Sequence, residues 1–168
     1  MSRPITESVT ASSSTQAATS DAPRANASLS NLMVQVRDDL AGLTVLELED
    51  GMTADLGEKL IAMIQTYGDE GVKALANIIA SGKVSAEILS HTLRWLARID
   101  DRKTYDARLM LLTDCLRSTS HIIRDGALLG LSTLGDRRAI DVIGNVAACE
   151  THASLKRDME EVLKQLST

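Results

Sequence analysis

The clearest hydrophobic pattern in the chain lies in residues 123–136, where apolar and small residues recur every three or four positions. These residues are Ile123, Ala127, Gly130, Leu131 and Leu134. The spacing places them on one face of an amphipathic helix, which Gly135 is expected to end. Asp136 can then cap the next helix. Because one helix cannot bury such a face by itself, the pattern predicts neighbouring helices that cover it.

The same pattern occurs four times, which indicates an internal repeat. One equivalent stretch lies 35 residues upstream of residues 123–136, and another lies 32 residues further upstream. A third lies 32 residues downstream of residues 123–136. A second amphipathic segment lies between successive copies, at 72–79, 105–116 and 140–148. Regular pairs of this kind predict stacked helical hairpins joined by short loops. Gly126 and Gly130 lie inside one predicted helix, where we expect them to allow close packing of the next repeat.

One copy resembles a known repeat family. The matching residues are Ile123-Arg124, Gly126-Ala127, Gly130-Leu131 and the run from Leu134 to Ala139. They are similar to a HEAT repeat, and most of all to the HEAT-like repeat named after phycobiliprotein lyases. The resemblance covers about residues 52–168 and implies a short right-handed α-solenoid of helix pairs. Arg137 replaces the Pro that usually follows the family's Gly-Asp turn.

The pattern divides the chain into three parts. Residues 1–28 are rich in Ser, Thr and Ala and have almost no large apolar residue, so this tail is predicted to be disordered. In residues 29–51, apolar side chains from Leu29 to Leu43 step by three or four, which predicts a helix and a linker. We interpret this helix as a cap over the first repeat, with a docking helix for a partner as the alternative. Residues 52–168 form the predicted repeat domain.

Charge and composition exclude several classes of function. The net charge is −5, and residues 51–168 carry 15 Lys and Arg against 16 Asp and Glu. Nucleic-acid binding is therefore not expected, since phosphate contacts require clustered cations. No stretch approaches the roughly 18 apolar residues that a membrane span needs, so we expect no membrane association and a cytoplasmic location. Cys115 and Cys149 lie apart and are expected to be buried or half-buried reduced thiols.

No residue pattern indicates catalysis or a cofactor. His91, His121 and His152 lie in three different repeats, and their spacing does not suggest one metal site, so each is interpreted as structural. The acidic pairs lie at predicted helix ends or in linkers, where capping and solvation explain them. Trp95 falls on the row that faces the adjacent helix, and we expect it to be structural rather than a binding anchor. The protein is accordingly not expected to be an enzyme.

The repeat register also predicts a candidate partner-binding face on the second helix of each pair. Its residues are Arg94, Arg98, Leu129, Thr133, Glu161 and Gln165. Arg94 and Arg98 are four residues apart and so share one side of their helix. Leu129 is apolar where the family repeat usually carries a polar residue. A solvated helix face without a partner is the alternative interpretation.

These observations predict a non-catalytic scaffold or adaptor that is monomeric alone and binds another protein through the concave face of a short solenoid. Relatives of the similar repeat type help to attach bilin chromophores. The resemblance therefore implies one alternative, an accessory subunit or lyase-like enzyme that acts on a chromophore or a modified protein. A nucleic-acid binder is the second alternative.

Overall fold

The computed structural model describes residues 22–42 and 53–168, and this part of the chain is all-α, as the hydrophobic pattern predicts. In chain order the elements are α1 (Ala22–Gly42), α3 (Thr53–Tyr67), α4 (Asp69–Ala80), α5 (Ala86–Ala97), α6 (Tyr105–Cys115), α7 (His121–Leu134), the 3₁₀ turn η1 (Arg137–Ala139), α8 (Ile140–Cys149) and α9 (Ala153–Ser167). No strand occurs within the two described ranges.

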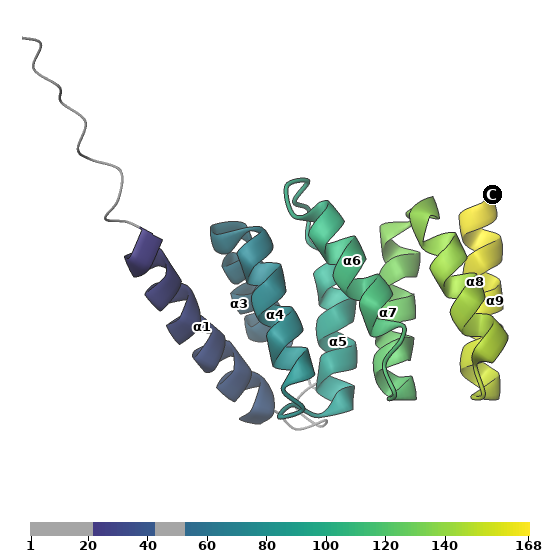
Figure 1. Ribbon diagram of the computed structural model, residues 1–168, viewed down its shortest axis with the longest axis horizontal. Helices are drawn as coiled ribbons and strands as arrows, with labels where there is room; N and C mark the ends of the chain where they lie inside the picture. The colour runs from purple at the N-terminus through teal and green to yellow at the C-terminus, as the bar shows by residue number, and fades with distance from the viewer. Residues whose placement is uncertain (1–21, 43–52) are drawn as a thin grey trace, which may run out of the picture.

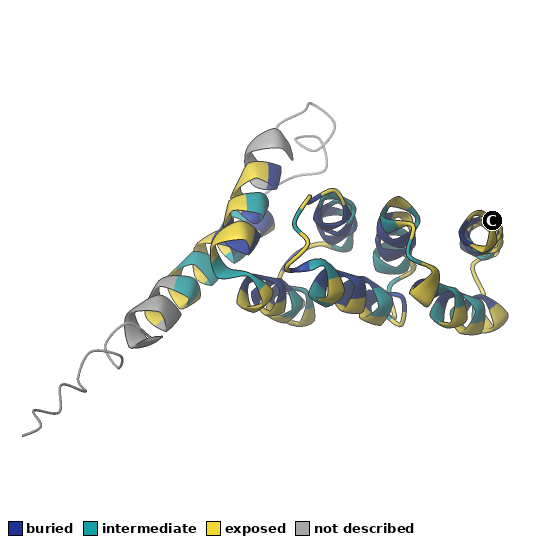
Figure 2. Ribbon diagram, turned by 90° about the horizontal axis from the view of Figure 1, so that it is seen from above, coloured by how far each residue is buried: buried dark blue, intermediate teal, exposed yellow. Residues whose placement is uncertain are grey.

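The helices form a row of two layers. Figure 1 shows them side by side along the long axis, and Figure 2, seen from above, separates the layers. One layer contains α3, α5, α7 and α9, and the other contains α4, α6 and α8. Successive helices of the first layer contact one another, with the closest packing between α5 and α7. The right-handed superhelical sense implied by the family resemblance stays a prediction.

Helix α1 begins earlier than the sequence analysis predicts. The predicted boundary between a disordered tail and a helix lay at residue 29, whereas the helix begins at Ala22. The local sequence explains the difference, because Ala has the highest helix propensity and Pro23 is tolerated in a first turn. Val36 and Leu40 are buried where α1 packs on α3 and α4. The rest of the predicted tail and the linker at 43–52 lie outside the described residues.

The two layers enclose one continuous core of mainly aliphatic side chains to which all the described helices contribute. Leu40, Ile64, Leu75, Leu112 and Leu131 belong to five different helices and are fully buried. Full burial of such a side chain stabilises a fold by about 1.5–3 kcal/mol. The chain contains no Phe. The core therefore depends on close packing of many aliphatic side chains rather than on a few aromatic rings.

Two glycines permit the close approach of α5 and α7. A Cβ atom at Gly126 would lie 2.5 Å from Ser90 Cα and 2.7 Å from the Ser90 carbonyl oxygen. A Cβ atom at Gly130 would lie 3.1 Å from the Leu93 carbonyl oxygen. The prediction that both glycines allow close helix packing is confirmed, but the neighbour is α5 of the preceding repeat, so the prediction that they admit the next repeat is wrong. At this crossing the α7 backbone lies directly against the α5 backbone.

The turn after α7 also follows the sequence prediction. Gly135 adopts a left-handed conformation with φ 65°, and its amide donates to the Leu131 carbonyl. A residue with a Cβ atom would be strained there. The Asp136 side chain then accepts a hydrogen bond of 2.8 Å from the Arg138 amide and caps the 3₁₀ turn that leads into α8.

A buried arginine closes the C-terminal end of α5, and no sequence pattern indicates it. Arg108 on α6 is only 1% exposed. Its guanidinium donates hydrogen bonds to the carbonyl oxygens of Leu96 (3.0 Å) and Asp101 (2.7 Å) and to the Thr104 hydroxyl (3.3 Å). A buried charge is tolerated only when its donors are satisfied, and here backbone carbonyls do most of this. Arg108 therefore orders the loop between α5 and α6.

The glycine contact predicts a specific loss of stability. Replacing Gly126 by Ala should destabilise the fold by about 1–3 kcal/mol, because the new methyl group overlaps the Ser90 backbone and the helices must move apart. Thermal unfolding should show this as a lower Tm, at about 2–4 °C for each kcal/mol. Gly144→Ala in α8 is the matched control, since a Cβ atom there meets nothing within 4 Å. The control should stabilise α8 slightly, and equal Tm values for the two variants would contradict the packing argument.

Candidate functional site

The structure places five of the six candidate partner-binding residues on α5, α7 and α9, which are neighbours in one layer, and the sixth, Arg98, directly after the end of α5. None of them lies in the core. Arg98, Leu129, Thr133, Glu161 and Gln165 are exposed, and Arg94 is half-buried. Leu129 is the single large apolar residue of the group, and 39% of it is exposed.

Arg94 connects α5 to α7. Its guanidinium forms an ion pair with Asp125 at 2.8 Å, and 37% and 36% of the two side chains are exposed. The Arg94 Nε atom is buried and has no hydrogen-bond partner in the described part of the chain. The side chain is therefore held against α7 instead of extending into solvent, which leaves Arg98 as the more accessible cation.

Among the remaining candidate residues, some contact a neighbouring helix and others face solvent. Gln165 on α9 exchanges hydrogen bonds with Ser132 on α7, accepting from its hydroxyl at 2.8 Å and donating to its carbonyl at 3.2 Å. The Thr133 hydroxyl donates to the Leu129 carbonyl within α7. Glu161 pairs with Lys164 of its own helix, at 3.3 Å. Gln165 therefore holds α9 against α7, whereas Leu129 and Glu161 face solvent.

Trp95 packs across the first layer, as the sequence register predicts. A Cβ atom at Gly57 of α3 would lie 3.1 Å from the indole ring, so the ring covers this glycine. The Arg98 guanidinium lies over the indole ring, 5.5 Å from the ring centroid. The indole thus fills the space between α3 and α5 and remains half-buried.

The three histidines line one groove, which the sequence analysis did not expect. The groove has a volume of about 300 Å³, crosses α5, α7 and α9, and is lined by His91, His121 and His152. Their sequence separations of 30 and 31 residues are close to the repeat length, and this is the signal that could have revealed the convergence. The described residues contain no group of His, Cys, Asp or Glu side chains arranged to hold a metal ion.

The groove has a mixed charge. The rings of His121 and His152 stack with centroids 4.6 Å apart, and the Ser154 hydroxyl lies 3.1 Å from the His152 Nδ1 atom. Burial, together with the nearby Arg94 cation, lowers the pKa of His91, which favours its neutral form at pH 7. Glu87, Asp125 and Asp158 also line the groove, so carboxylates and imidazoles face the same space.

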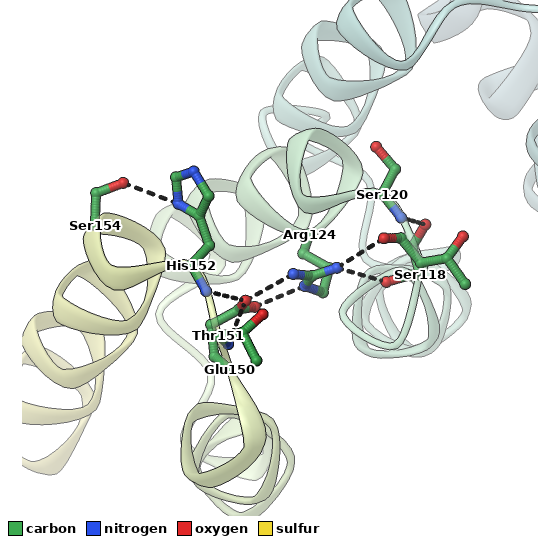
Figure 3. A network of polar contacts seen from close by, with 8 residues as sticks. Ser118, Ser120, Arg124, Glu150, Thr151, His152 and Ser154 are labelled. Atoms are coloured by element: carbon green, nitrogen blue, oxygen red, sulfur yellow. Dashed lines mark hydrogen bonds and ion pairs between the residues drawn. The ribbon is translucent and has the colours of Figure 1, made fainter.

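Close to His152, an arginine–glutamate pair joins α7 to the loop between α8 and α9 (Figure 3). Arg124 binds Glu150 through two hydrogen bonds of 2.7 Å and also donates to the carbonyls of Ser118 and Thr119. The Glu150 carboxylate accepts from the amides of Thr151 and His152, just before α9 begins. No sequence pattern indicates this pair, because its members are 26 residues apart.

The same contacts control the ionisation of Glu150. Hydrogen bonds from the Arg124 guanidinium lower the pKa of the carboxyl from 4.5 to about 2, with support from the two backbone amides and against the effect of burial. Only 1% of the Glu150 side chain is exposed. The carboxylate therefore stays charged throughout the physiological pH range and fixes the backbone that carries His152.

The two cysteines differ in their surroundings. Cys115 is buried, and its burial raises the pKa of the thiol to about 11, which keeps it protonated and unreactive. Cys149 is the last residue of α8 and is exposed, so the expectation that both thiols are covered is wrong for Cys149. Cys149 and Ala148 lie on the exposed side of the last turn of α8, whereas Ala147 faces the core, and this explains the difference.

Comparison with known proteins adds no relatives: no family model, curated protein or solved structure matches the chain. The resemblance to HEAT-like repeats consequently stays a prediction from the residues alone. In the described part of the chain, no helix combines the length and the apolar character required to cross a membrane.

The packing of Trp95 predicts that truncation weakens the fold. Trp95→Ala should destabilise by about 2–3 kcal/mol, less than the 3–5 kcal/mol typical of a fully buried ring. The corresponding fall in Tm is about 5–10 °C. Arg98→Ala is the control, because it removes only the cation–π contact, worth about 0.5–1 kcal/mol at exposed sites. A Trp95→Ala variant as stable as the Arg98→Ala variant would show that the ring is a surface feature.

Glu150 predicts a distinct pH dependence. The pKa of Glu150 is lower in the folded state than in the unfolded chain. The stabilisation that its carboxylate provides is therefore fully present above about pH 4.5, the usual pKa of a Glu side chain, and is lost as the pH falls towards about 2, the pKa in the folded protein. Glu150→Gln should lower stability by about 1.5–3 kcal/mol at pH 7, the range for a hydrogen bond to a charged group. The difference in Tm between wild type and variant should shrink between pH 5 and pH 2. A difference that is constant over this range would argue against a charged Glu150.

Proposed function

We propose that the protein is a non-catalytic binding module that holds a segment of another protein on the face formed by α5, α7 and α9. The observation that carries the proposal is the groove shared by these three helices, because a surface built from several helices suits an extended protein partner. Leu129 lies one helical turn beyond Asp125, and Arg98 lies one turn beyond Arg94, so both continue the line of groove residues.

The composition of this face supports a polypeptide partner. The groove presents imidazoles, carboxylates and a guanidinium, which suit hydrogen bonding to a peptide, whereas small-molecule pockets are mostly apolar and enclosed. Leu129 adds an exposed apolar contact, and Arg98 adds a cation with an apolar stem. Apolar and arginine contacts next to a polar rim are typical of protein interfaces.

A charge introduced at Leu129 tests the proposal. Full-length wild type and Leu129→Asp would be used as baits, and the captured proteins compared by quantitative mass spectrometry. We expect at least one wild-type partner to bind about tenfold less to Leu129→Asp, because burying a carboxylate against an apolar contact is costly. Val34→Asp is the matched control, since Val34 on α1 is also an exposed apolar residue, with 48% of it accessible.

Leu129 and Val34 are both exposed, so we expect each substitution to leave the fold intact, and circular dichroism would verify this for each variant. Arg94 is unsuitable for charge reversal, because a carboxylate there would lie beside Asp125. Unchanged capture by folded Leu129→Asp would contradict the proposed face. A bound tetrapyrrole or a salt-labile nucleic acid in place of a protein would favour the corresponding alternative function.

A further inference from the structure

The opposite layer carries a second groove, between α4 and α6. Its volume is about 370 Å³, and its lining includes the apolar residues Val72, Ala76 and Leu111. Met110 also lines it and is 65% exposed, more than any other large apolar side chain in the described part of the chain. Methionine is flexible and polarizable, and it is common on surfaces that accept apolar side chains of a partner.

Carboxylates flank this apolar groove. Asp106 and Asp114 lie four residues before and four residues after Met110, so all three share one side of α6. At a rise of 1.5 Å per residue the two carboxylates are separated along the helix by about 12 Å. Asp69 on α4 also lines the groove, where Lys73 is the single cation among the lining residues.

The arginines that pair with these carboxylates can be replaced by cations of a partner at a small cost in free energy. Asp106 pairs with Arg138 at 2.8 Å, but 81% of the Asp106 side chain is exposed, and Arg138 also binds Asp136. Asp114 pairs with Arg117 at 3.3 Å, with both side chains more than half exposed. Exposed pairs of this kind contribute little to stability, so a partner's cation can replace either arginine.

We propose that the α4–α6 groove binds a helical segment of a partner protein that carries a bulky apolar side chain with Lys or Arg four residues before and after it. The apolar side chain enters the groove beside Met110, and the two cations meet Asp106 and Asp114. This arrangement is the complement of the acidic–apolar–acidic stripe on α6. The groove belongs to the layer opposite α5, α7 and α9, so this surface is separate from the proposed binding face.

Two designed peptides test the assignment with the full-length chain. The first is a fluorescently labelled amphipathic helix with Lys four residues before and after a central Leu, and the second has Glu in place of both Lys residues. Fluorescence anisotropy should show saturable binding of the Lys peptide with one peptide per chain. The Glu peptide should bind at least about tenfold more weakly, and raising the salt concentration should weaken only the Lys peptide.

Variants of the protein test whether the Lys peptide binds at the α4–α6 groove. Met110→Ser should weaken the Lys peptide about tenfold, and so should Asp106→Asn combined with Asp114→Asn, which should also reduce the salt dependence. All three positions are exposed, so the fold should survive, as circular dichroism would verify. Leu129→Asp should bind the Lys peptide like wild type, which separates this inference from the proposed function.

Four outcomes of the peptide-binding assays would overturn the inference. They are no saturable binding of the Lys peptide, equal affinity for the two peptides, equal binding by wild type and Met110→Ser, and loss of binding in Leu129→Asp alone. Sedimentation of the free chain tests a different occupant. A dimer that Met110→Ser dissociates would assign the groove to a second copy of the chain and would also overturn the proposal.

Discussion

The backbone contact between α5 and α7 is the constraint on which the rest of the structure depends. Gly126 has no Cβ atom, so α7 approaches the Ser90 backbone more closely than any other residue at that position would permit. This close approach brings a carboxylate oxygen of Asp125 to 2.8 Å from the guanidinium of Arg94. Residues of both helices then line the same groove. An added methyl group would separate the layer at its centre, where α5, α7 and the core side chains beneath them meet.

Buried charges then determine how the helix ends are held. Arg108 satisfies carbonyl groups at the end of α5, and Arg124 joins the loop before α7 to the loop before α9 through Glu150. In both cases a guanidinium replaces water as the partner of backbone or carboxylate oxygens, which is why the loops can be short. The Arg124–Glu150 pair also fixes the backbone at His152, so the stacked imidazoles depend on a contact that lies outside the groove itself.

The two layers differ in chemistry as a consequence of this architecture. Helices α5, α7 and α9 contact one another through polar pairs, and most side chains that line their shared groove are polar or charged, with Ile122 and Leu155 as the apolar exceptions. Between α4 and α6 the groove is apolar, and carboxylates flank it. The two proposed surfaces would select different partner segments, and their positions in opposite layers would allow both to be occupied at the same time.

The sequence by itself determined the helical class, the positions of most helices and the close packing at Gly126 and Gly130, because these follow from local periodicity and residue size, but it did not identify α5 as the neighbour. It also identified Leu129 as a non-core apolar residue. Only the tertiary structure decided that Arg94 pairs with Asp125, that Arg124 pairs with Glu150, and that three histidines share one groove. Each of these pairings joins residues about 26 to 31 positions apart, and it depends on the distance and rotation between two helices. Hydrophobic periodicity specifies which face of a helix is buried, but not how far that helix is shifted along its neighbour, and this shift selects the polar partners.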